Sequence, residues 1–229
     1  MPTAPLANSL LASLPRAEFD QLRPQMTVTS LAQGKVLAEV GDEIDQVYFP
    51  FGGMISLRII MKNGKAIETS TIGKDGAFGA AATFGLYKSQ VRAIIQISMT
   101  AALIPAATMR RHGETSKALQ LMCMRFNENL LAQARVTAAC NALHLIEERF
   151  CRWLLQTSSV TQSTTIQLTQ EFLSEMLGVR RTSVTEVAQK LQEAGLINCS
   201  RGVINILDRD ALKARSCECF ETLREQNAI

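Results

Sequence analysis

The chain has 229 residues, of which 47% are hydrophobic and 20% are charged. These are the values of a globular protein of one or two domains, so we expect a packed core and exclude an intrinsically disordered chain. The formal net charge of +3 is too small to indicate nucleic-acid binding by itself.

The sequence contains no apolar stretch long enough to cross a membrane, and its first residues lack the basic and apolar order of a signal peptide. We therefore expect a cytoplasmic protein in which thiols stay reduced. The six cysteines mostly lie in apolar runs, so buried thiols are expected at Cys123, Cys140, Cys151, Cys199, Cys217 and Cys219.

Residues 6 to 25 show helical spacing of apolar residues and predict one or two short helices. Short apolar runs separated by glycine then predict strands at Val28, 36–37, 47–49, 54–60, 67–72 and 94–97. The pair Asn63-Gly64 is typical of a hairpin with a type I′ turn. Strands with glycine turns every eight to twelve residues indicate an antiparallel barrel or sandwich.

A long helix is predicted from Ala118 to Ala139. Its apolar residues recur at alternating steps of four and three, which is the seam spacing of a coiled coil and predicts a dimer interface. A single amphipathic helix packed on its own barrel would give a similar stripe, so both interpretations stay open. The residues of this predicted seam are Leu119, Cys123, Phe126, Leu130 and Thr137.

The stretch from Leu168 to Ile197 predicts two helices joined by a tight turn. Thr169 is a candidate N-cap of the first helix, and Gly178 ends it. The apolar residues of the second helix lie on one stripe, which leaves a polar face opposite it that begins with arginines. This pattern is typical of a helix-turn-helix with a recognition helix, although an ordinary corner between two helices would also produce it.

The segment after Gly195 favours the helix-turn-helix. Residues 196–199 and 203–207 predict two short strands around Ser200, Arg201 and Gly202, which makes a small hairpin attached to the second helix. A helix-turn-helix with such a hairpin is a winged helix. Before it, residues 143–154 predict a supporting helix, and the uncharged segment SSVTQSTTIQ predicts a loop or hairpin.

The charge of this C-terminal segment does not make the case for DNA. Residues 160 to 229 hold eight Lys and Arg against nine Asp and Glu. Attraction to phosphate must therefore come from local clustering of Arg180, Arg181, Lys190 and Arg201, with helix N-termini contributing.

The order of these parts resembles the Crp/Fnr family of bacterial transcription regulators over nearly the whole chain. The resemblance rests on the stretches GDEIDQVYFPFGGMISL, ERFCRWLLQT, LTQEFLSEMLGVRRTSVTEVAQKLQEAGLI and SRGVINI. It implies an α+β fold with an N-terminal antiparallel β-roll of the jelly-roll type (residues 1–107), a long dimerisation helix (108–140) and a C-terminal winged helix-turn-helix (141–229). It also implies a homodimer that binds double-stranded DNA specifically, regulates transcription with RNA polymerase, and is often controlled by a small molecule in the β-roll.

The resemblance places Arg181 where family members commonly carry a residue that contacts base edges, and a guanidinium can bind guanine bidentately. Thr182 and Glu186 differ from the Glu and Arg of the cyclic-AMP-responsive members, so the target sequence should differ too. Glu186 also fits a capping box with Ser183, an alternative that stays open. We expect DNA contacts from Thr169, Gln170, Arg180, Arg181, Thr182, Ser183, Thr185, Glu186, Gln189, Lys190, Ser200 and Arg201.

The β-roll departs from the pattern of the cyclic-nucleotide-binding members. In GKDGAFGAAATFG, Ala80 occupies the position of an expected Glu, and Arg92 is followed by Ala93 rather than Ser or Thr. A buried cyclic phosphate requires several donors, so we do not expect classical cyclic AMP binding. Another effector, or none, is expected, with Gly76, Phe78, Gly79 and Arg92 as candidate contacts.

We predict neither a metal site nor a cofactor. The iron–sulfur members carry a cysteine cluster near the N-terminus, whereas Cys123 is the first cysteine here. Cys217-x-Cys219 is interpreted as a pair without matching ligands nearby, and a thiol switch there is a hypothesis. His112 and His144 are expected to be surface or partly packed residues.

The sequence offers no constellation expected of an enzyme: it has no Walker-type loop, nucleophile elbow or HExxH motif. The competing hypothesis is a sensory module that acts through protein partners, with a helix-turn-helix that packs rather than binds DNA. Salt-dependent binding to duplex DNA would separate the two.

Overall fold

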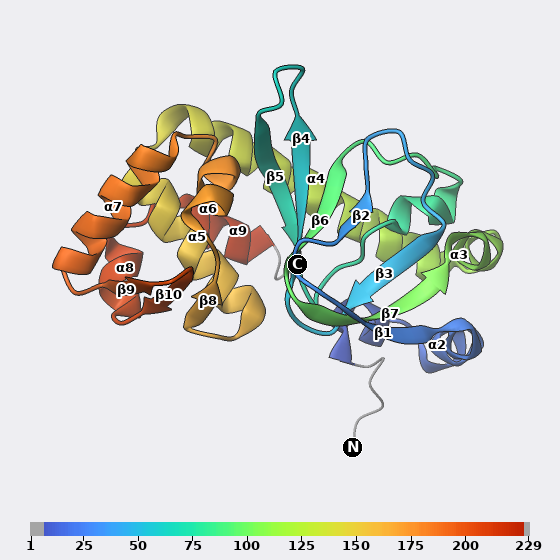
Figure 1. Cartoon of the computed structure of the whole chain (residues 1–229). Coiled ribbons are helices and arrows are strands. Elements are labelled where there is room, and N and C mark those ends of the chain that lie inside the picture. Colours follow the sequence, from blue (N-terminus) through green and yellow to red (C-terminus); the bar gives the residue numbers. More distant parts are fainter. Residues whose placement is uncertain (1–6, 227–229) are drawn as a thin grey trace. The chain divides into compact units, whose positions relative to one another are not determined.

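The computed structural model describes residues 7–226, shown in Figure 1. The chain forms two compact units, one of Met1–Leu57 with Thr71–Leu131 and the other of Arg58–Ser70 with Ala132–Ile229. The second unit therefore contains a hairpin from the strand-rich half of the sequence in addition to the C-terminal segment.

The first unit begins with the predicted short helices, α1 (Ser9–Ala12), α2 (Arg16–Leu22) and a 3-10 helix η2 (Arg23–Gln25). Residue 6, the first of the predicted helical stretch, lies outside the described residues. Asn8 caps α1 by accepting a hydrogen bond from the Leu11 amide. The buried Asn8 amide group also donates to the carbonyls of Pro50 and Gly76, both at 2.9 Å, which fastens the N-terminal helix to the sheets.

Seven strands form two antiparallel sheets, as expected for the β-roll (Figure 1). Their orders are β1-β7-β3 and β2-β6-β4-β5. The sequence did not predict β7, because only Ser98 separates it from β6 and no glycine marks the turn. The bounds are β1 (Thr27–Leu31), β2 (Val36–Ala38), β3 (Gln46–Pro50), β4 (Met54–Ile60), β5 (Ala66–Ile72), β6 (Arg92–Ile97) and β7 (Met99–Pro105).

The β4–β5 hairpin forms, but its turn is not the expected type I′. A type I′ turn needs positive φ at both central residues. Here Gly64 has a φ of +80° and donates its amide hydrogen to the carbonyl of Met61, whereas Asn63 is not among the described residues with positive φ. The loop is therefore a type I turn followed by a left-handed glycine, which is the three-residue hairpin connection.

A 3-10 helix, η3 (Ala80–Phe84), and α3 (Ala106–Gly113) lead to the long helix α4 (Lys117–Leu143). Leu119, Cys123 and Phe126 on α4 are 1%, 0% and 7% exposed and belong to the hydrophobic core of the first unit. Leu130 packs against the same core. The long helix is confirmed, but Leu119, Cys123 and Phe126 already fill the β-roll of their own chain, as the alternative of packing on the chain's own barrel expects, and they are not free to form a dimer interface. For the partly buried Leu130 and Thr137 the dimer interface stays a prediction.

The second unit contains the helices and strands of the predicted winged helix. The segment SSVTQSTTIQ is not a simple loop, because its first residues end a helix and its last residues form a strand. The wing strands belong to an antiparallel sheet with the order β8-β10-β9. The bounds are α5 (Ile146–Thr161), β8 (Thr165–Gln167), α6 (Gln170–Leu177), α7 (Arg181–Glu193), β9 (Ile197–Ser200), β10 (Val203–Ile206), α8 (Arg209–Ala214) and α9 (Cys219–Gln226).

Among the described residues, we find no helix that combines the length and the apolar character needed to span a bilayer.

Candidate nucleic-acid interface

Helix α6 is held at both ends. Thr169 adopts an extended conformation and its hydroxyl accepts a hydrogen bond from the Phe172 amide, as expected for an N-cap. Gly178 ends the helix with a φ of +63°, in the left-handed region that favours glycine. The buried guanidinium of Arg149 on α5 donates to the carbonyl of Leu177 and to Asn141 Oδ1. Leu177 is the last residue of α6, so its carbonyl has no partner within the helix, and the guanidinium supplies one.

Helix α7 buries one face and exposes the other, as the spacing predicted. Val184 and Leu191 are fully buried, and Val187 and Ala188 are nearly so. In Figure 1, α7 lies beside α6, which completes the helix-turn-helix. Seven predicted DNA-contacting residues are exposed along α7 and at its N-terminus, namely Arg180, Arg181, Thr182, Thr185, Glu186, Gln189 and Lys190.

The first turn of α7 rules out one of the two roles predicted for Glu186. The helix begins at Arg181 with Arg180 as its N-cap, so Ser183 lies inside the first turn and cannot be the cap. The capping box of Ser183 and Glu186 is therefore wrong. Glu186 is exposed on the same side of the helix as Thr182 and is available for contact with a ligand.

Two of the predicted contacts, Thr185 and Gln170, form a hydrogen bond with each other. The Thr185 hydroxyl lies 2.9 Å from Gln170 Oε1 and 3.0 Å from the Arg181 carbonyl. This contact joins the start of α6 to α7, and Gln170 is consequently only partly exposed. The pair positions the two helices, whereas Ser183 is half-buried in the first turn of α7.

The wing tip carries a cation in a defined conformation. Arg201 and Gly202 have φ values of +47° and +79°, the pair of positive values that a type I′ turn requires. The Leu168 amide donates to the Gly202 carbonyl at 2.7 Å, which places the wing tip beside Thr169 at the start of α6. Gln192 of α7 accepts a hydrogen bond from the Cys199 amide of β9 at 2.9 Å. The exposed polar face of α7, Thr169 and the wing are thus parts of one rigid arrangement.

The hairpin of residues 58–70 contacts the helix-turn-helix, which the sequence did not predict. The side chain of Arg58 is only 3% exposed, and its Nη1 atom lies 2.6 Å from Glu175 Oε2. Its Cζ atom lies 4.9 Å from the centre of the Phe172 ring. The indole of Trp153 donates to Glu68 Oε1 at 3.0 Å. The ion pair and the hydrogen bond both join residues that are far apart in the sequence, so no local residue spacing could have predicted them.

A cavity of about 660 Å³ in the first unit is lined by two of the four residues predicted to contact an effector. Phe78 and Gly79 line it together with mainly apolar side chains, among them Ile44, Leu57 and Ile72. Gly76 and Arg92 are not among its described lining residues, so their assignment as effector contacts finds no support. The Arg92 guanidinium instead pairs with Glu39 at 2.8 Å.

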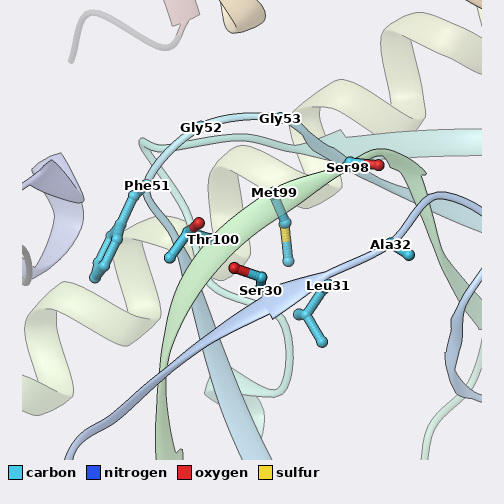
Figure 2. Close-up of a pocket in the computed structure, with 9 residues that line it drawn as sticks. All are labelled: Ser30, Leu31, Ala32, Phe51, Gly52, Gly53, Ser98, Met99 and Thr100. Carbon is cyan, nitrogen blue, oxygen red and sulfur yellow. The ribbon is translucent and has the colours of Figure 1, made fainter.

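A second cavity in the same unit, of about 620 Å³, is shown in Figure 2. It lies between the chain around Gly52 and Gly53 and the strands β1 and β7, which supply Ser30 and Thr100. All nine lining residues have side chains that do not ionise near neutral pH. This cavity therefore offers no group for acid–base chemistry.

The interpretation of Cys217 and Cys219 as a pair without matching ligands is wrong. Cys140 and His144 lie beside them, and one side-chain ligand atom from each of the four residues lies within 4.8 Å of the others. A hydrogen bond joins the Cys140 and Cys217 sulfur atoms at 3.6 Å, and it lowers the pKa of Cys140 and raises that of Cys217. The hydrogen bond with Cys140 raises the pKa of His144. In contrast, burial raises the pKa of Cys151 to about 12.

Comparisons with known proteins agree with this architecture. Residues 148–215 match the family described as the Crp-like helix-turn-helix domain. No curated protein matches the sequence significantly.

Several solved structures resemble the chain over most of its length. A transcriptional regulator of the Crp/Fnr family from Eubacterium rectale is 16% identical, with a TM-score of 0.72 over 92% of this chain and 98% of that one. FixK2 from Bradyrhizobium japonicum is 13% identical, with a TM-score of 0.70 over 84% and 98%. A Crp/Fnr-family regulator from Thermus thermophilus is 22% identical, with a TM-score of 0.68 over 83% and 98%. At these identities the similarity shows the fold.

Proposed function

Because the chain has the fold of the Crp/Fnr transcription regulators and carries a Crp-like helix-turn-helix domain at residues 148–215, we propose that it is a sequence-specific DNA-binding regulator of transcription. The observation that carries this proposal is the exposed polar face of α7, which begins with Arg180 and Arg181 beside the wing. The functional division that we propose is a sensor at residues 1–107, a connecting segment at 108–140 that contains most of α4, and a DNA-binding domain at 141–229.

Arg181 is the residue best placed to determine the base sequence. It is exposed at the start of a 13-residue helix whose opposite face is buried, and recognition helices enter the major groove with their N-terminal residues. A guanidinium can bind the O6 and N7 atoms of guanine together, whereas the Glu186 carboxylate can accept a hydrogen bond from cytosine N4. Together with Thr182, these residues would give a target different from that of the cyclic-AMP-responsive members.

Other exposed groups suit the phosphate backbone. The first amides of α7 have no intrahelical acceptors, and the helix dipole favours an anion at that end. Arg180 at the same end and Arg201 at the wing tip add positive charge. These contacts would fix the position of the domain on the duplex and leave the sequence choice to Arg181, Thr182 and Glu186.

We propose a homodimer that uses a different face of α4 from the buried one. Leu121, Met124 and Leu131 are 53%, 57% and 44% exposed, although they are large apolar residues. With Glu128 between Met124 and Leu131, their positions follow steps of three, four and three, which is the seam spacing of two paired helices. A second copy of this chain would cover the stripe, and a two-fold DNA site requires two copies of the recognition helix.

The apolar cavity of the β-roll would hold the effector, if this regulator responds to one. Lys88 is the only cationic side chain among its described lining residues, so the cavity lacks the cluster of donors that a buried cyclic phosphate requires. A small, mainly apolar ligand fits this lining better. The regulator would then act on transcription through contact with RNA polymerase, as the fold family leads us to expect.

The test is binding of full-length protein to a selected duplex and to a scrambled duplex over a series of salt concentrations. We expect preference for the selected duplex and a steep loss of affinity with salt. Arg181→Ala should reduce the discrimination by about 1 to 3 kcal/mol. The matched control is Arg16→Ala, which removes an exposed arginine of α2 and should leave the affinity for both duplexes unchanged. Equal binding of wild type to both duplexes would overturn the proposal and favour a module that acts through protein partners.

A further inference from the structure

Four residues with metal-binding side chains converge in the second unit. Cys140 and His144 are four positions apart, and the His144 amide still donates to the Cys140 carbonyl at 3.1 Å, so the two side chains lie on one face at the end of α4. Cys217 precedes α9, and Cys219 is its first residue. Two segments separated by more than seventy residues thus bring three sulfur atoms and one imidazole to a single point.

The spacing of these atoms fits one metal ion. Cys140 Sγ and Cys217 Sγ are 3.6 Å apart, and Cys219 Sγ is 3.6 Å from His144 Nδ1. A tetrahedral zinc ion with Zn–S bonds of about 2.3 Å and a Zn–N bond of about 2.0 Å separates its ligands by roughly 3.5 to 3.8 Å. All four atoms lie within 4.8 Å of one another, so small rotations of the side chains would complete the tetrahedron.

The surroundings of the four residues also suit a metal site. His144 Nε2, the nitrogen that does not face the sulfur, lies 3.1 Å from Glu218 Oε1. A carboxylate in this position holds the imidazole in the orientation and tautomer that a metal-binding histidine needs. The three cysteines are at most 6% exposed, and the buried cation of Arg152 acts favourably on the negative charge of their sulfur atoms.

We propose that Cys140, His144, Cys217 and Cys219 bind one zinc ion in a closed tetrahedral site that fastens the start of α9 to the end of α4. Four protein ligands leave no position for water or substrate, so the site is structural rather than catalytic. Three thiolates and one divalent cation carry a net charge of −1, which Arg152 compensates. The thiols that are protonated before binding release their protons to solvent.

The structure favours one ion over the other uses of these thiols. A cluster of several irons divides its protein ligands among different iron atoms, so some of its ligands lie farther apart than these four, and such clusters are usually held by four cysteines. A disulfide between Cys140 and Cys217 would leave Cys219 and His144 beside each other without a role. Val136 of α4 is a partly buried apolar residue that packs against the three cysteines.

The test starts from full-length protein purified under reducing conditions. Metal analysis should find one zinc per chain, and Co²⁺ exchanged into the site should give the intense visible bands of a tetrahedral thiolate complex. Cys217→Ser and Cys219→Ser should lose the bound metal, whereas Cys151→Ser and Cys199→Ser, which alter thiols outside the cluster, should retain it. Glu218→Gln keeps all four ligands and should weaken zinc binding by about 10- to 100-fold.

The Co²⁺ spectrum of the wild type does not depend on the folding of any variant. Protein that neither contains zinc nor gives a tetrahedral spectrum with added Co²⁺ would overturn the proposal. Acid-labile sulfide with stoichiometric iron, or a Cys140–Cys217 disulfide found by mass spectrometry in protein purified without reductant, would do so as well. None of these measurements involves DNA, so the result is independent of the proposed regulatory function.

Discussion

The exposed stripe of α4 yields a quantitative prediction for the double variant Leu121→Ala/Met124→Ala. Fully burying a Leu or Met side chain contributes about 1.5 to 3 kcal/mol. Since the two side chains are 53% and 57% exposed, covering the rest of each would contribute about 1 kcal/mol. A two-fold interface contains each residue twice, so the variant should lose about 4 kcal/mol of dimer stability, which raises the dimer Kd roughly a thousandfold.

Sedimentation velocity over a range of concentrations measures this change. Alanine is the best helix former and neither side chain belongs to the core, so the circular dichroism of the variant should match that of the wild type. The matched control is Val28→Ala/Val36→Ala, which truncates two apolar residues of similar exposure on β1 and β2. If the α4 variant and this control both keep the wild-type Kd, this face of α4 is not the dimer interface.

Three further substitutions test other parts of the structure. Arg201→Ala should weaken binding to specific and scrambled duplexes equally and reduce the salt slope by about one, as measured by fluorescence anisotropy; a loss limited to the specific duplex would contradict a phosphate contact. Glu175→Gln leaves the buried guanidinium of Arg58 opposite a neutral amide, so calorimetry should show a loss of about 1 to 3 kcal/mol in unfolding free energy that Arg58→Met partly restores in the double variant. An unchanged melting temperature would show that this ion pair contributes nothing. Phe126→Ala should cost about 3 to 5 kcal/mol in urea unfolding, because its ring is 7% exposed in the core; a near-neutral effect would mean that the ring is not packed there.

The sequence predicted the helix-turn-helix well because its signals are local. Thr169 at the N-cap, Gly178 at the C-cap and the buried stripe that includes Val184 and Leu191 all act within a few residues. The wing was predicted in the same way, from the turn residues Arg201 and Gly202 between two short apolar runs. In contrast, the strand β7 has no turn residue before it and was missed.

The sequence could not decide questions that depend on distant partners. Helix α4 carries apolar residues on two faces, and only the β-roll determines that the face with Phe126 is buried while the face with Met124 is exposed. Cys140 and His144 gave no sign of their relation to Cys219, because more than seventy residues separate them and the spacing matches no compact motif. The pairing of Arg92 with Glu39 likewise depends on the sheet that brings the two segments together.

The most direct test of dimeric, sequence-specific DNA binding is to sequence the genomic DNA fragments that the purified full-length protein retains. We expect enrichment of a two-fold symmetric motif whose half-sites are about 34 Å apart along the duplex, since each subunit would present α7 to successive major grooves. For Arg181→Ala, the enrichment should fall at the base positions that this residue contacts. Retained fragments with no common motif, or the same motif with equal enrichment for Arg181→Ala, would show that the protein does not read DNA in this way.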